Sequence, residues 1–431
     1  MKVDIQIISS CTMKPSSQTP NDLQNYKLSF LDQVSPPVFM PLVLFYPSDN
    51  HLTNTYKSNQ LKQSLSEALT RYYPLAGRLI NNTYVNCNDE GIPYFEARAN
   101  CKLSDVLSNP NPQEMNKFLP YELDDVKDIG MIIQVTFFEC GGMAVAIGIS
   151  HKIADALSFF LFITSWAAVS RGEGENIPSP KFESANLFPP RDLADYNHKL
   201  GMVNRNDIVT KRFVFTASKL AALRGKYTNT VNHEYQRRCP TRIEALSAFI
   251  WTRFVNANGG NEDNHDKMYM LNHAVNLRTR MDPPLAGYYF GNISRPAITI
   301  PSLDNINDEE KGYEIVNQVR DAIRNVSGDN KALNSMKEKA KLVKKGEMVS
   351  VSFTSLCRFP SYEADFGWGK PVWVGSASLT FKNLVVFLDT PSGDGIEAWI
   401  NMKLEDLAKL EADKEFLSYV SSTPDGKVSV Y

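Results

Sequence analysis

The stretch SHKIADALSFF, residues 150–160, places a histidine directly after one apolar segment and an aspartate four residues later, where a second apolar segment begins. Residues 143–150, MAVAIGIS, form a short unbroken apolar run that predicts a buried strand, and the run after Asp155 predicts a helix. His151 would then lie just beyond the end of a buried strand, which is where α/β folds place reactive side chains. The fold class that this stretch predicts is α/β.

Two roles are open to His151 and Asp155 from their spacing alone. The histidine can act as a general base near neutral pH, but a buried core histidine followed by an aspartate that caps a helix is a common structural arrangement. A zinc site is not predicted, because two ligands without a further histidine or cysteine cluster are too few. The chain has no GxSxG, GxGxxG or GxxxxGK[ST] motif, so neither a serine nucleophile nor a phosphate-binding loop is predicted.

Strand-like and helical segments alternate on both sides of this stretch and divide the chain into two α/β halves. A chain of 431 residues is long enough for two domains. We expect a first domain over residues 1–175, a crossover linker over 176–207 that is rich in Pro, Gly, Asn and charge, and a second domain over 208–431. Two halves of similar make-up suggest a site in the cleft between them.

Composition and charge restrict the class of protein. The 46 basic and 48 acidic residues leave a formal charge of −2, which argues against binding to a nucleic-acid backbone. The longest apolar run, residues 154–169, is interrupted by polar residues and is too short for a membrane span, and the first residues lack the pattern of a secretory signal. The six cysteines show no CxxC spacing and predict reduced thiols. We expect a cytoplasmic protein that binds no nucleic acid, membrane or metal.

Two segments of the second half have unusual composition. Residues 362–371, YEADFGWGKP, alternate glycines with large aromatic residues, which is typical of a tight, close-packed turn. Residues 272–292, NHAVNLRTRMDPPLAGYYFGN, end a strand-like run at Arg278 and Arg280. An arginine in that position can form bidentate hydrogen bonds with a buried carboxylate. The first segment is interpreted as a packing joint.

These motifs resemble those of the plant BAHD acyltransferases. HKIAD in mid-chain, YFGN in the second half and DFGWGKP nearer the C-terminus occur in the order of that family, and the similarity covers almost the whole chain. The form SHKIADALS, with Ala156 where many members have glycine, most resembles the branch of alkaloid O-acetyltransferases; acylsugar and terpenoid acyltransferases are similar too. The resemblance implies two similar-sized chloramphenicol acetyltransferase-like domains, each a mixed β-sheet with flanking helices, and an active-site channel at their interface.

The resemblance also implies roles for the motif residues. His151 would be the general base in the channel, and Asp155 would point away from the substrate to form a structural ion pair with Arg278. A further set would lie away from the reacting atoms and maintain the fold and the channel: Asp365, Phe366, Gly367, Trp368 and Gly369.

The activity that the resemblance implies is acyl transfer from acyl-CoA to a hydroxyl of a small molecule, with acyl-CoA as co-substrate and no permanently bound cofactor. A thioester is already activated, so the reaction needs a base, a polar group for the oxyanion and alignment of two substrates. His151 would supply the base in a direct transfer, and Trp368 and Thr354 are candidates for the oxyanion. We expect a monomer that acetylates a plant specialised metabolite, with an alkaloid as the preferred acceptor. The alternatives are an acylsugar or terpenoid acceptor, a condensation or hydrolysis reaction, or a binding protein on the same fold.

Overall fold

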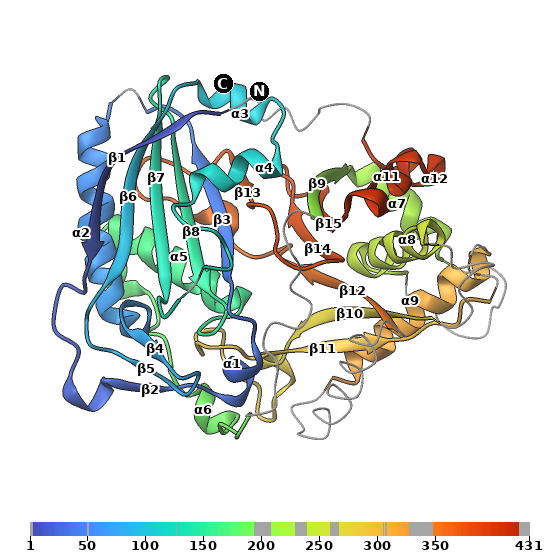
Figure 1. Cartoon of the computed structure of the whole chain (residues 1–431), viewed down its shortest axis with the longest axis horizontal. Helices are drawn as coiled ribbons and strands as arrows, with labels where there is room; N and C mark the ends of the chain where they lie inside the picture. Colours follow the sequence, from blue (N-terminus) through green and yellow to red (C-terminus); the bar gives the residue numbers. More distant parts are fainter. Residues whose placement is uncertain are drawn as a thin grey trace.

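The protein is described by a computed structural model that covers residues 3–49, 51–125, 127–193, 208–228, 239–258, 267–304, 306, 308–326 and 348–421. Two six-stranded sheets dominate the structure, one built mainly from each half of the chain, and both carry helices (Figure 1). The predicted α/β class with two sheet-containing domains is confirmed.

The first sheet runs, in spatial order, through β1 (Ile5–Met13), β6 (Ile92–Ala99), β7 (Met131–Phe138), β8 (Met143–Ser150), β3 (Phe39–Tyr46) and β13 (Trp373–Gly375). Its neighbours are antiparallel except β6 and β7, so the sheet is mixed. A small sheet contains β2 (Asn25–Lys27), β5 (Tyr84–Asn86) and β4 (Arg78–Ile80). The helices of this half are α1 (Phe30–Val34), α2 (Asn54–Arg71), α3 (Leu103–Leu107), α4 (Pro112–Met115), α5 (Ala156–Ser170) and α6 (Ser184–Leu187).

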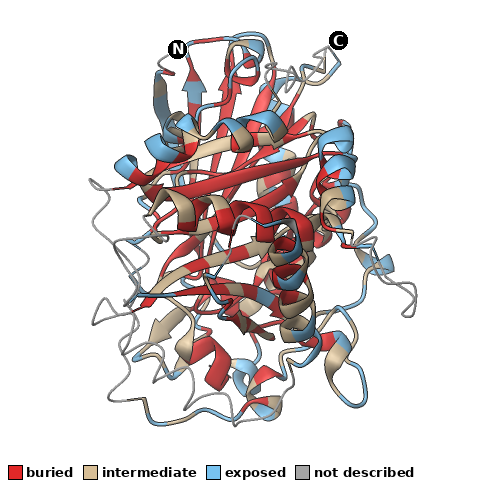
Figure 2. Cartoon of the chain, turned by 90° about the vertical axis from the view of Figure 1, so that its right-hand side faces the viewer, coloured by how far each residue is buried: buried red, intermediate tan, exposed pale blue. Residues whose placement is uncertain are grey.

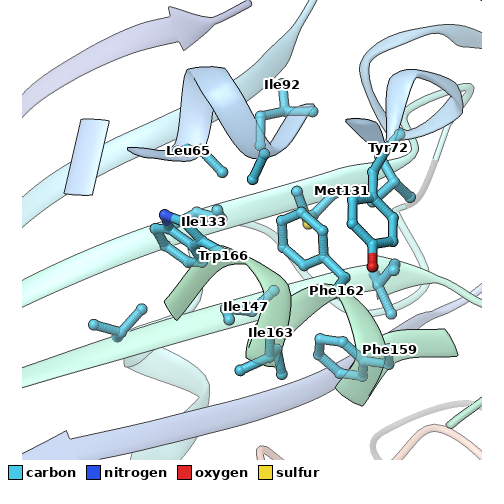
Figure 3. Packing of buried hydrophobic residues seen from close by; sticks show 14 of the residues in the cluster. Leu65, Tyr72, Ile92, Met131, Ile133, Ile147, Phe159, Phe162, Ile163 and Trp166 are labelled. Atoms are coloured by element: carbon cyan, nitrogen blue, oxygen red, sulfur yellow. The ribbon is translucent and has the colours of Figure 1, made fainter. Parts of the chain in front are cut away.

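One face of the first sheet is covered by α2 and α5. Figure 3 shows Trp166 of α5 near Ile133 and Ile147 of the sheet. Tyr72, which ends α2, packs its ring against Phe162 of α5 at a centroid distance of 5.4 Å. Every residue of β7 and β8 is buried because the other face is covered too, which explains why both strands are unbroken apolar runs. This packing fixes the end of β8 and the start of α5, and His151 lies between them.

The second sheet runs through β11 (Ser294–Thr299), β10 (Met268–Asn276), β12 (Met348–Ser355), β14 (Leu384–Asp389), β15 (Ile396–Lys403) and β9 (Ile208–Phe215). Its outer face is covered by helices that include α7 (Ala217–Lys226), α8 (Arg242–Ala257), α9 (Glu309–Arg324), α11 (Leu404–Ala412) and α12 (Lys414–Tyr419). In Figure 2 the strands are mostly buried, whereas these helices keep exposed outer faces. This is the pattern of amphipathic helices on a buried sheet.

The inner faces of the two sheets meet in a shared apolar cluster. Phe45 of β3 lies in it together with Val386 of β14 and Trp399 of β15. Residues 371–381, PVWVGSASLTF, lie inside the expected second domain of residues 208–431, but they contribute β13 to the first sheet, where Trp373 pairs with Phe45. Strand propensity predicts that a strand forms, but it does not specify which sheet the strand joins.

The predicted crossover, 176–207, is described as far as residue 193, and residues 194–207 lie outside the described residues. Lys181 N donates to Tyr288 O at 2.8 Å, and Phe290 N donates to Lys181 O at 2.9 Å. Phe30 N of α1 donates to Phe188 O at 2.8 Å. The described part of the crossover therefore lies against both α1 and the YYFGN segment. Among the helices that the structure describes, none is long and apolar enough to cross a membrane.

Candidate active site

His151 is held by hydrogen bonds of both its backbone and its ring. Its N–H donates to Val38 O at 2.8 Å. Its ring Nδ1 lies 3.1 Å from Ala154 O and 3.1 Å from Asn292 Oδ1. The side chain is half-buried, and burial lowers the pKa of His151 below its usual 6.5, although the charge of Asp155 acts in the opposite direction. The imidazole is therefore neutral at pH 7 and can accept a proton.

Asp155 is both the N-cap of α5 and one half of a buried ion pair. Its Oδ1 accepts from Ser158 N at 2.9 Å. The Nη1 of Arg278 lies 2.7 Å from Asp155 Oδ2, and its Nη2 lies 3.2 Å from Oδ1. Burial acts to raise the pKa of Asp155, but the Arg278 guanidinium and the hydrogen-bond donors outweigh it and hold the pKa below 3.8. The carboxylate is thus ionised and fully engaged.

Arg278 connects α5 to the segment that carries the YFGN motif. Besides Asp155, it donates from Nε to Tyr289 O at 2.9 Å and from Nη2 to Gly291 O at 3.1 Å. Only 1% of Arg278 is exposed. A bidentate guanidinium with this many acceptors is a rigid buried link between the two halves of the chain.

The backbone conformation at Gly291 of the YFGN motif requires a glycine. Its φ is +124°, a conformation that other residues rarely adopt. A Cβ at this position would lie 2.8 Å from the Oγ of Ser184 in the crossover segment and 2.9 Å from its Cβ. The close approach brings the next residue, Asn292, beside His151.

Asn292 and Asp32 are site residues that the sequence analysis did not identify. Asn292 Nδ2 donates to His151 O at 2.8 Å and to Asp32 Oδ1 at 2.8 Å. Asp32 lies in α1, where it forms a capping box with Ser29. The S-x-x-D pattern and the final residue of YFGN were both visible in the sequence, but no local pattern links two positions 260 residues apart.

Lys152, which follows His151, is a third residue that the sequence analysis did not identify. Its Nζ donates to Gln33 O at 2.7 Å and to Ser35 O at 2.9 Å. The side chain is buried, and burial lowers the pKa of Lys152 to about 7, against the opposing charge of Asp32. Lys152 thereby attaches the histidine loop to the C-terminal end of α1.

The DFGWG segment forms a tight turn at the opposite end of α5. Asp365 Oδ1 accepts from Gly367 N at 2.8 Å and Gly369 N at 2.9 Å, and Gly367 has φ +112°. Ser170, the last residue of α5, donates from Oγ to Phe366 O at 2.7 Å. A helix of 15 residues is roughly 22 Å long, so this turn lies about one helix length from the N-cap of α5 and from the histidine loop that precedes it.

The two candidates for the oxyanion lie in different places. The Trp368 indole N–H has no hydrogen-bond partner among the described residues, but it packs on Tyr46 and Phe366 in the turn at the far end of α5. Thr354 lies on β12, between Phe353, which packs with the outer helices, and Ser355. Alternation along the strand therefore turns Thr354 toward the first half of the chain. Of the two residues, only Thr354 therefore remains a candidate donor to the oxyanion.

The arrangement offers acid–base chemistry at one histidine. Among the residues that the structure describes, no group of three or more His, Cys, Asp or Glu side chains is placed to hold a metal ion. A neutral imidazole sits where the two halves meet, on a loop fixed by α1, α5 and the YFGN segment. A site of this kind needs no metal ion to exchange a proton with a bound molecule.

Comparison with known proteins identifies the family. The Transferase family model matches residues 3–417. The chain is 37% identical to stemmadenine O-acetyltransferase of Catharanthus roseus, over 98% of this chain and 99% of the relative. It is 36% identical to a limonoid 21-O-acetyltransferase of Melia azedarach, again over 98% of this chain and 99% of the relative.

Solved structures agree with this match. The crystal structure of vinorine synthase has a TM-score of 0.84 at 34% identity and covers 98% of this chain and 100% of its own. TRI101 of F. sporotrichioides, complexed with coenzyme A and T-2, has a TM-score of 0.69 at 17% identity over 92% of this chain and 99% of its own, a likeness of fold alone. The chain belongs to the transferase family of BAHD acyltransferases, and it is an acyl-CoA-dependent acyltransferase.

Proposed function

We propose that this enzyme transfers an acetyl group from acetyl-CoA to a hydroxyl of an alkaloid, with a terpenoid alcohol of limonoid type as the second acceptor class. The relatives that support this choice are named as O-acetyltransferases of stemmadenine and of limonoids. They share more than a third of their residues with this chain over nearly its full length.

The observation that carries the reaction type is the environment of the His151 ring. Ala154 O lies 3.1 Å from Nδ1, and a carbonyl oxygen can only accept a hydrogen bond, so Nδ1 carries the proton. The other ring nitrogen, Nε2, then keeps its lone pair. A neutral histidine with an unprotonated Nε2 is suited to act as a general base at pH 7.

The proposed reaction is a direct transfer between two bound substrates. His151 Nε2 takes the proton of the acceptor hydroxyl, and the resulting alkoxide attacks the acyl carbonyl of acetyl-CoA. The carbon–sulfur bond breaks, and protonated His151 returns the proton to the CoA thiolate. Thr354 is the candidate donor to the oxyanion. No acyl-enzyme forms, and each proton and electron pair is accounted for by the two substrates and one histidine.

The other motif residues are proposed to support the site without touching the substrates. Asp155 and Arg278 hold the start of α5, and the turn formed by Asp365, Gly367 and Trp368 holds its end. The supporting observations are the buried ion pair at one end of the helix and the hydrogen-bonded turn at the other.

We further propose that residues 1–175 and 208–431 are the two domains, joined by the crossover 176–207, with the active-site channel between them. We also propose that the enzyme acts as a monomer. The six free cysteines fit a reducing compartment and favour the cytoplasm.

The test is a product assay combined with intact-protein mass spectrometry. The purified enzyme is incubated with acetyl-CoA and a panel of hydroxylated alkaloids and limonoids, and the products are identified by mass. A mass increase of one acetyl group on an alkaloid or limonoid is the expected result. If acetyl-CoA alone leaves a stoichiometric acetyl adduct on the protein that moves to the acceptor on its addition, the direct mechanism is wrong.

A further inference from the structure

We infer that Asn292 and Asp32 are positioning residues that, together with the carbonyl of Ala154, hold the proton of His151 on Nδ1. This inference rests on the proposed role of His151 as base and adds the groups that make its Nε2 the reactive atom. The two residues come from opposite halves of the chain, and the geometry links them to the ring in a single series of hydrogen bonds.

The first link is the orientation of the Asn292 amide. Its Nδ2 lies 2.8 Å from His151 O and 2.8 Å from Asp32 Oδ1, and both atoms can only accept. If the amide were turned over, its Oδ1 would face these two oxygens and all three would repel. Asn292 Oδ1 must therefore be the atom that faces His151 Nδ1, at 3.1 Å.

The second link is the carboxylate of Asp32, which cannot turn to accommodate a flipped amide. Its Oδ2 accepts from Ser29 N at 2.8 Å and from Ser29 Oγ at 2.6 Å, and from Ser184 Oγ at 3.3 Å. Its Oδ1 accepts from Asn292 N and Nδ2. Burial, with no exposed surface on the residue, raises the pKa of Asp32, while its hydrogen bonds from Ser29 and Asn292 act to lower it. Five donors on two oxygens leave both oxygens engaged as acceptors.

The consequence is a ring whose Nδ1–H points between two oxygens, those of Ala154 and Asn292. When Nε2 takes the substrate proton, the ring becomes cationic, and hydrogen bonds from a cation to such acceptors are stronger than those from a neutral ring. The same series of contacts therefore selects the reactive tautomer and stabilises the protonated intermediate. The charged groups around the ring are the Asp155–Arg278 pair, Asp32 and Lys152, and all of them stay in place in the variants below except Asp32.

The test uses the full-length enzyme with ¹⁵N-ring-labelled histidine, and the His151 signals are assigned by their loss in a His151→Gln variant. In the wild type, long-range ¹H–¹⁵N correlation spectra near neutral pH should show the proton on Nδ1. Asp32→Asn places an NH₂ group against the donors of Asn292 or Ser29, so a measurable fraction of His151 should move to the Nε2–H tautomer. Asn292→Ala removes one acceptor from Nδ1–H and should lower the pKa of the acidic limb of kcat.

Both variants should lose about 10- to 100-fold in kcat, the equivalent of one charge-assisted hydrogen bond, with little change in KM for acetyl-CoA. Asp105→Asn is the matched control, because it makes the same substitution in a carboxylate that accepts from Lys102 N at 2.9 Å at the start of α3; its kcat and tautomer should match the wild type.

Three outcomes would overturn the inference: a wild-type His151 protonated on Nε2, an unchanged tautomer in Asp32→Asn, or a kcat within a factor of about three of the wild type in both variants. The wild-type spectrum decides even if a variant does not fold. Full activity in a His151→Ala variant would instead contradict the proposed function and leave the tautomer result standing.

Discussion

Replacing Asp155 by asparagine removes the charge from the ion pair while preserving the shape of the side chain. The substitution should keep the N-cap of α5, because asparagine caps a helix about as well as aspartate. It leaves Arg278, of which 1% is exposed, as a buried cation without its counter-charge. The structure thus allows the loss of the charge to be separated from the loss of the cap.

The expected loss in the free energy of unfolding is large for a single substitution. Removing one partner of a buried ion pair typically destabilises a protein by about 3–5 kcal/mol. Asp155→Ala should cost about 1 kcal/mol more, because it also removes the acceptor for Ser158 N. Stabilities of natural proteins are about 5–15 kcal/mol, so Asp155→Asn should fold with reduced yield.

The assay is urea denaturation followed by tryptophan fluorescence and circular dichroism, on Asp155→Asn, Arg278→Met and the double variant. The double variant should be more stable than the sum of the two single losses predicts, because it has neither an unpaired charge nor a vacant partner. The depressed pKa of Asp155 adds a pH dependence. Its stabilisation is complete above the unfolded pKa near 4 and is lost as the pH falls through the lower folded value.

The reasoning is refuted if the two losses simply add, since the residues would then not be coupled. It is also refuted if Asp155→Asn unfolds at the wild-type urea concentration but loses activity, because Asp155 would then act on the reaction and not on the fold.

The remaining predictions concern the base, the turn and the buried lysine. His151→Ala should bind CoA and fold normally but lose about 10²- to 10⁴-fold in rate. Because burial lowers the pKa of His151, the acidic limb of the wild-type pH–rate profile should lie below pH 6.5. An acidic limb above pH 7 would contradict this. Asp365→Ala removes the hydrogen-bond acceptor for two backbone N–H groups and should lower the free energy of unfolding, measured by urea denaturation, by about 1–3 kcal/mol. A crystal structure in which Asp365 contacts CoA or the acceptor alcohol would disprove its structural role. Burial lowers the pKa of Lys152 to about 7. Between pH 7 and 10 the unfolded chain therefore binds more protons than the folded chain. Over this range the free energy of unfolding of the wild type, relative to that of Lys152→Met, should rise by up to about 1.4 kcal/mol per pH unit. A difference that stays constant between pH 7 and 9 would show that Lys152 remains charged when folded.

The local structure around the histidine was predictable because it depends on neighbours in the chain. The apolar run 143–150 is β8, and the run after Asp155 is α5 with Asp155 as its N-cap. The spacing offered Asp155 as a helix cap and the family resemblance implied an ion pair, and in the structure the same carboxylate makes both contacts. The local pattern marked Arg278 and Arg280 as arginines able to bind a buried carboxylate, but the pairing of Arg278 with Asp155, 123 residues away, came from the family resemblance.

What the sequence by itself determined are the features set by short-range periodicity and motif content: two α/β halves, the strand–histidine–helix unit and the family to which they point. The tertiary structure alone decided which distant segments meet. It placed β13 in the sheet of the other half, laid the crossover against α1 and the YYFGN segment, and brought Asp32 to Asn292 beside His151 across 260 residues. The physical reason is that strand and helix patterns report which face of an element is buried, whereas the partner on that face is selected by the packing and hydrogen bonding of the whole chain.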